Sequence, residues 1–113
     1  MKILGKVIKG KGLGYKTANL LIEGRELLKE VPDGVFFAIV SYQDKDHPAL
    51  AIKGMVGDLE VRLLDFEGNL YSQILAVEIL EKLRDLMEFK SQEDLVDQIE
   101  EDIKKARQYF KLK

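Results

Sequence analysis

The sequence contains no cysteine and no tryptophan, and only two of its 113 residues are proline. Without cysteine the chain has no disulfide framework, no thiolate zinc site, no iron–sulfur ligation and no cysteine nucleophile. An excess of basic residues is also absent, because 18 basic and 20 acidic residues leave a net charge of −2. Nucleic-acid binding depends on such an excess, so the composition argues against a nucleic-acid partner.

Long apolar runs are absent as well. No segment approaches the length needed to cross a bilayer, and Lys6 and Lys9 interrupt the apolar stretch that an N-terminal signal peptide would need. The hydrophobic content, 46%, is nevertheless too high for a disordered chain. We therefore expect one compact, cytoplasmic domain over residues 1–113 that binds neither nucleic acid nor membrane.

Short apolar stretches separated by turn residues fill residues 1–72. The clearest predicted strand is 35–42, which is rich in β-branched and aromatic residues. Pro32-Asp33-Gly34 predicts a turn before it, with glycine accepting a positive φ. Residues 43–48 are expected to be a polar hairpin loop, from which 49–53 return as a second strand.

Two further stretches bear on the sheet. Residues 20–31 are compatible with an amphipathic helix or with two short strands, because short apolar runs do not decide between them. Residues 59–66 begin with strict alternation of apolar and charged residues. This alternation places Glu60 and Arg62 on the face opposite the neighbouring aliphatic side chains.

Helical spacing dominates the remainder of the sequence. Residues 73–88 carry apolar residues at intervals typical of a helix. Ser91 is a good N-cap for a second helix, with acidic residues in its first turn. The apolar face expected for that helix consists of Leu95, Ile99, Ile103, Ala106 and Phe110. Strands followed by two helices predict a small β-barrel or sheet over residues 1–72 with a helical tail over 73–113.

A glycine-rich segment, residues 10–14, precedes Lys16 and Thr17 and has part of the spacing of a phosphate-binding P-loop. Tyr15 stands at the position of the second glycine, where a side chain obstructs the wrapping of backbone around phosphate. We therefore reject the P-loop interpretation. A weaker expectation is that this loop, with Thr17 and Asn19, places backbone N–H groups and polar side chains near an anion.

Glu60 is a candidate general base if it is ordered and close to a nucleophile. Its alternative is a solvated glutamate paired with Arg62 or with a cross-strand lysine, and the pattern alone favours this alternative. His47, the only histidine, lies between Asp46 and Pro48 and is expected to be an exposed loop residue.

Six fragments match one known family in the same order. They are residues 14–20 (Gly-Tyr-Lys-Thr-Ala-Asn-Leu), 32–36, 59–66 and 68–71, then Leu83-Arg84 with Phe89, and finally Leu95, Gln98-Ile99, Asp102 and Ala106-Arg107. Together they resemble riboflavin kinases, which occur as the C-terminal module of bacterial FAD synthetases and as stand-alone eukaryotic enzymes. The resemblance implies a six-stranded antiparallel Greek-key β-barrel closed by two α-helices, and it favours strand and loop for residues 20–31.

The resemblance also implies a reaction: transfer of the γ-phosphoryl group of Mg·ATP to the ribityl 5′-hydroxyl of riboflavin, giving FMN and ADP. Thr17 would ligate Mg²⁺, Asn19 would contact the metal or the phosphates, and Glu60 would accept the hydroxyl proton. Arg84 and Phe89 would help to form the flavin site. The implied nucleotide-binding residues are Gly10, Lys11, Gly12, Gly14, Lys16, Thr17 and Asn19.

The sequence departs from the family in places, because Lys16 replaces a proline and Arg62 replaces a common histidine, and the stretch from Gly54 to Glu60 is short. These differences motivate a second hypothesis, a non-catalytic flavin- or nucleotide-binding module, and a third, an interaction scaffold without a ligand. The length leaves no room for an adenylyltransferase domain, so FMN is the expected end product. We expect the protein to be a monomer. The sequence leaves ATP and CTP open as phosphoryl donors.

Overall fold

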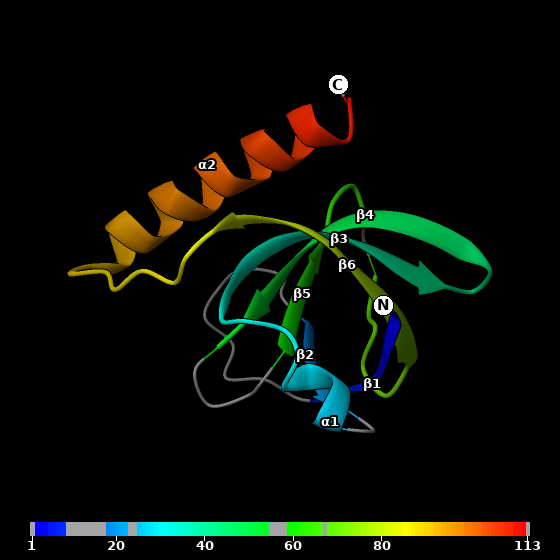
Figure 1. Cartoon of the computed structure of the whole chain (residues 1–113). Helices are drawn as coiled ribbons and strands as arrows, with labels where there is room; N and C mark the ends of the chain where they lie inside the picture. Colours follow the sequence, from blue (N-terminus) through cyan, green and yellow to red (C-terminus); the bar gives the residue numbers. More distant parts are fainter. Residues whose placement is uncertain (1, 9–17, 23–24, 55–58, 67, 113) are drawn as a thin grey trace.

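The computed structural model describes residues 2–8, 18–22, 25–54, 59–66 and 68–112 (Figure 1). They form a β-barrel with a long helix lying across its outside. The strands are β1 (Lys2–Ile8), β2 (Ala18–Ile22), β3 (Gly34–Tyr42), β4 (Lys45–Lys53), β5 (Leu59–Leu63) and β6 (Ile74–Arg84), and the helices are α1 (Arg25–Leu28) and α2 (Gln92–Tyr109).

The six strands close into a barrel in the order β1-β2-β5-β4-β3-β6, and every neighbouring pair is antiparallel. Strand β1 closes the barrel because it pairs with β2 on one edge and with β6 on the other. Strands β3, β4 and β5 follow one another as neighbours, and β6 returns to lie beside β3, which is a Greek-key arrangement. The predicted six-stranded antiparallel Greek-key barrel is confirmed.

The predicted helix over residues 73–88 is wrong. Residues 74–84 are strand β6, so the barrel extends beyond residue 72 and a single helix follows it. Leu75, Val77 and Ile79 alternate into the barrel interior, as a strand requires. Leu80 faces the outer layer, as alternation requires; the ladder between β3 and β6 then shifts register, so that Leu83, three residues further on, faces the outer layer as well. This change of phase within one strand produced apolar spacings of three and four residues, which imitate a helix.

The hairpin between β3 and β4 is tighter than predicted. Only Gln43 and Asp44 form the turn, and both have positive φ (51° and 60°), as in the two-residue turns that match strand twist. Strand β4 therefore begins at Lys45, and His47 lies on a strand, half-buried, with its ring edge-on to Phe66 at 5.4 Å. The expectation of an exposed loop histidine is wrong.

The barrel interior forms one apolar cluster, to which described residues between Leu20 and Val31 contribute. Strand β2 ends at Ile22, as the resemblance implied, but residues 25–28 form one helical turn where a loop was expected. Leu28 and Val31, which follow β2, pack into the interior cluster. Gly5 of β1 lies where the walls are close, because a Cβ there would be 2.9 Å from Cδ1 of Ile22.

A second apolar layer lies between the outer face of the barrel and α2. The helix begins after Ser91, whose side chain accepts a hydrogen bond from the Asp94 backbone N–H at 3.1 Å, as predicted. The layer contains Val35, Phe37, Leu50, Leu64 and Ala106, with Ile52, Leu80, Leu83, Ile103, Phe110 and Leu112 packed against it.

Among the described residues, no helix combines the length and apolar character that a membrane span requires.

Candidate active site

One row of register partners crosses five strands of the barrel. Asn19 of β2 is opposite Glu60 of β5, and Glu60 is opposite Ile52 of β4. Ile52 is in turn opposite Val35 of β3, which is opposite Arg84 at the end of β6. Directly opposed residues in antiparallel strands have Cα atoms about 4.5–5.5 Å apart, so each member of this row lies beside the next.

Glu60 and Asn19 lie on the outer face of the barrel. Their sequence neighbours Leu59, Val61 and Leu20 belong to the interior cluster, so alternation directs Glu60 and Asn19 outward. Both residues are half-buried. The pairing of β2 with β5 thus places a carboxylate beside an amide, with an apolar residue next to the carboxylate.

The glycine-rich segment and its neighbours lie outside the described residues. This concerns the predictions for Gly10, Lys11, Gly12, Gly14, Lys16 and Thr17. The chain on either side of the segment is described: β1 ends at Ile8, β2 begins at Ala18, and Ile8 is the register partner of Asn19. The described residues Ile8 and Ala18, which flank the segment in the sequence, therefore both lie beside Asn19.

The oxygen donors present suit a magnesium ion that is shared with a substrate. In the described part of the chain, no group of three or more His, Cys, Asp or Glu side chains is arranged to hold a metal. Mg²⁺ bound with a nucleotide needs no such cage, since it takes one or two protein oxygens and completes its shell with phosphates and water. The Asn19 amide oxygen is a ligand of that kind.

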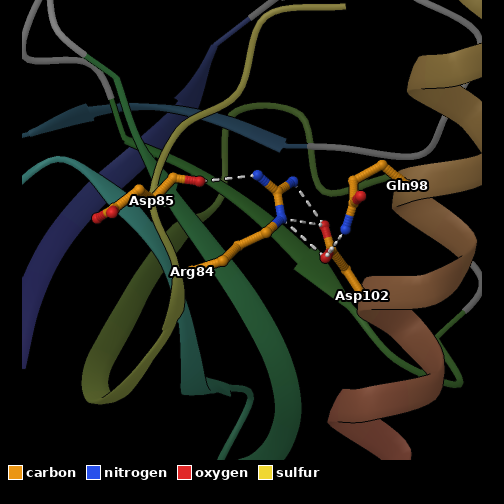
Figure 2. Close-up of polar contacts among 4 residues, drawn as sticks. All are labelled: Arg84, Asp85, Gln98 and Asp102. Carbon is orange, nitrogen blue, oxygen red and sulfur yellow. Dashed lines mark hydrogen bonds and ion pairs between the residues drawn. The ribbon is translucent and has the colours of Figure 1, made fainter.

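Arg84, at the far end of the row, contacts helix α2 (Figure 2). Its Nε donates to both carboxylate oxygens of Asp102, at 2.9 and 3.1 Å, and its Nη2 donates to Oδ2 at 2.7 Å. Its Nη1 donates to the backbone carbonyl of Asp85 at 3.0 Å. All three guanidinium nitrogens therefore have protein acceptors. Phe89 lies half-buried between β6 and α2, and the prediction that these two residues help to bind a flavin stays a prediction.

Sequence reasoning gave Asp102 no role of its own, although it is almost completely buried, with 2% of its surface exposed. It lies between Ile99 and Ala106, three and four residues away, on the buried face of α2. A carboxylate inside an apolar helical stripe needs a partner. That position was the signal that could have identified it.

The family model for riboflavin kinase (Flavokinase) matches residues 1–110. The chain belongs to the riboflavin kinase family. It is 36% identical over 121 residues to the bifunctional riboflavin kinase/FMN adenylyltransferase of Haemophilus influenzae, a match that covers 96% of this chain and 38% of the relative. The chain thus spans less than two-fifths of that relative's length.

Two solved structures share the fold of this riboflavin kinase family member. The macrolide-efflux protein of Streptococcus pneumoniae superposes with a TM-score of 0.77 at 29% identity, covering 94% of this chain and 36% of the other. The riboflavin kinase of Trypanosoma brucei superposes with a TM-score of 0.75 at 24% identity, covering 97% and 76%. At that identity the second likeness concerns the fold alone.

Proposed function

We propose that this chain is a riboflavin kinase, which transfers the γ-phosphoryl group of ATP to the ribityl 5′-hydroxyl of riboflavin and releases FMN and ADP. The proposal is supported by membership of the family and by one geometric observation. Glu60 and Asn19 are half-buried register partners on the outer face of adjacent strands, and Asn19 is also the register partner of Ile8, the last residue of β1.

In this proposal Glu60 accepts the proton of the ribityl hydroxyl as that oxygen attacks the γ-phosphorus. A carboxylate within hydrogen-bond reach of a primary alcohol is a sufficient base, because phosphoryl transfer depends mainly on positioning and charge neutralisation. Its half-buried position beside Ile52 keeps the side chain ordered while leaving it accessible to an alcohol.

Asn19 orients the nucleotide, together with Thr17. Their oxygens would hold Mg²⁺, which when bound neutralises charge on the transferring phosphoryl group. The residues Gly10, Lys11, Gly12, Gly14 and Lys16 complete the proposed nucleotide site. The proposal includes Mg²⁺ as the metal, ATP as the donor, a monomeric state and a cytoplasmic location.

The proposal is tested by incubating the purified chain with riboflavin, Mg²⁺ and either ATP or CTP, and by separating FMN from riboflavin chromatographically. We expect FMN with ATP and none when the metal is omitted. Glu60→Gln should lower kcat by roughly 10²–10⁴-fold, the usual contribution of a positioned general base.

A matched control is Glu78→Gln, because Glu78 is another half-buried glutamate on a barrel strand, paired with Ile39 of β3. This variant should keep wild-type kcat. Equal losses in the two variants would contradict the role of Glu60. Riboflavin binding by fluorescence quenching without FMN formation would contradict the kinase and favour a non-catalytic flavin-binding module.

A further inference from the structure

Arg84 and Asp102 form a largely buried ion pair, with side chains 20% and 3% exposed, which joins the end of β6 to the middle of α2 (Figure 2). The Asp102 carboxylate accepts from Arg84 through both oxygens and also from Gln98 Nε2 at 3.0 Å. A bidentate arginine–carboxylate contact fixes orientation as well as distance. The pair therefore fixes the contact between the middle of α2 and the end of β6.

A second ion pair joins α2 to the barrel and differs in burial. Arg107, near the end of α2, donates to Asp65 after β5 at 2.7 Å through one nitrogen. The side chains of Arg107 and Asp65 are 31% and 59% exposed. Those of Arg84 and Asp102 are 20% and 3% exposed. An exposed contact of this kind holds geometry weakly, because water competes and two long side chains must be ordered.

The Arg84–Asp102 pair also holds the start of the linker 85–91, which connects β6 to α2. Arg84 Nη1 donates to the Asp85 carbonyl. The Asp85 carboxylate pairs with Lys82, and this hydrogen bond lowers the pKa of Asp85. The linker thus leaves the barrel in a defined direction and carries Phe89 to the beginning of α2.

The row of register partners relates this pair to the proposed active site. Arg84 and Glu60 are separated by Val35 and Ile52, and both of these pack in the apolar layer beneath α2. Asn19 lies on the other side of Glu60, away from that layer. Ile52, which lies beside Glu60, therefore packs in the layer that α2 covers, whereas Asn19 lies on the opposite side of Glu60.

We propose that Arg84 is a positioning residue for the phosphoryl acceptor: through Asp102 it holds α2 and the linker 85–91 in the place that orients riboflavin against Glu60. This inference rests on the proposed function. It assigns Arg84 no contact with the reacting atoms, and it separates the acceptor side of the row, under α2, from the donor side at Asn19.

The test replaces the pair with apolar residues of similar size, Arg84→Met and Asp102→Leu, singly and together. Each single variant should lose stability because it leaves an unpaired buried charge, and the double variant should recover it, since well-packed apolar replacements of buried ion pairs are often neutral or stabilising. The KM for riboflavin should rise roughly tenfold in the double variant, with the KM for ATP changed less than about twofold.

The matched control is the exposed pair, replaced as Arg107→Met with Asp65→Leu. It should leave both KM values near those of the wild type. If the apolar Arg84/Asp102 double variant recovers stability and the riboflavin KM together, the pair only stabilises the fold and the inference is wrong. An equal rise in both KM values, or the same rise in the control, also overturns it.

A second measurement keeps this inference distinguishable from the proposed function. Backbone hydrogen exchange should accelerate over residues 95–103 of α2 in the Arg84/Asp102 double variant, but not in the control. If the wild-type chain makes no FMN, the proposed function fails, and titration of riboflavin fluorescence replaces the KM. Weaker riboflavin binding with faster exchange then supports the positioning role, and unchanged binding or exchange contradicts it.

Discussion

Two parts of the barrel's outer wall have similar apolar residues but different surroundings. On β3 and β4, Val35 and Leu50 are completely buried beneath α2. On β1, β2 and the start of β6, Leu4 and Leu21 are each 51% exposed and Ile74 is 65% exposed. The outward positions of both walls look alike in sequence, so apolar character on an outward position does not reveal which wall is covered.

The proposed catalytic residues lie at the boundary between these two walls. Strand β5, which carries Glu60, lies between β2, whose outer face is exposed, and β4, whose outer face packs beneath α2. A residue fully beneath α2 would be inaccessible to substrate, and one on the bare wall would be surrounded by water. The boundary gives Glu60 an apolar neighbour, Ile52, on one side and a polar neighbour, Asn19, on the other.

The largest expected effect on stability compares a residue of the outer face beneath α2 with one on the part of that face that is exposed to solvent. Leu50→Ala should lower the free energy of unfolding by about 2–5 kcal/mol, because it leaves a cavity between the barrel and α2. Leu4→Ala, on the bare wall, should change it by no more than about 0.5 kcal/mol. Chemical denaturation measures both. Similar losses would mean that the two walls do not differ energetically.

The next prediction concerns the polar side of the boundary. Asn19→Ala should lower kcat/KM for Mg·ATP roughly 10- to 100-fold, equivalent to about 1.4–2.7 kcal/mol of transition-state stabilisation. The KM for riboflavin should change little, because Asn19 lies away from α2. Initial rates at varied Mg·ATP measure the effect, with Leu21→Ala on the same strand as the control. A loss confined to riboflavin would reverse the assignment of donor and acceptor sides.

A smaller effect is expected at the start of the covering helix. Ser91→Ala removes the acceptor of the Asp94 N–H hydrogen bond and should cost about 1 kcal/mol of stability. Urea denaturation followed by far-ultraviolet circular dichroism measures it. Ser91→Asp should retain most of the stability, since aspartate is also a good N-cap. If both variants lose stability equally, the cap hydrogen bond is not the cause.

The smallest effect is expected at the exposed end of α2. Arg107→Met removes the ion pair with Asp65 and should change the free energy of unfolding by about 0.2–1 kcal/mol, less at high salt, because exposed ion pairs are screened. Denaturation at low and high ionic strength provides the measurement. A loss as large as that of Leu50→Ala would show that this pair, not the apolar layer, holds α2 in place.

The local sequence pattern predicted those elements whose apolar residues pack against a single core. Strand β3 and helix α2 were predicted close to their observed bounds. For α2 the reason is that Ser91 marks its start and the apolar residues after it keep one helical period. Strand β6 was mistaken for a helix because it faces the barrel interior at Leu75 and the α2 layer at both Leu80 and Leu83, which are three residues apart across a register shift. A strand that serves two cores in succession changes phase, and no local period describes it.

The candidate site divides in the same way. Alternation in β5 by itself determined that Glu60 lies on the face opposite Leu59 and Val61, and the match of the ordered fragments to riboflavin kinases depended on sequence alone. Only the tertiary structure brought Asn19 beside Glu60 and Asp102 to Arg84. Both contacts join residues distant in the chain, and they follow from barrel closure and helix docking, in which many apolar contacts act together. Local periodicity carries no information about such pairings, because it records which face a residue takes and not which strand or helix lies opposite.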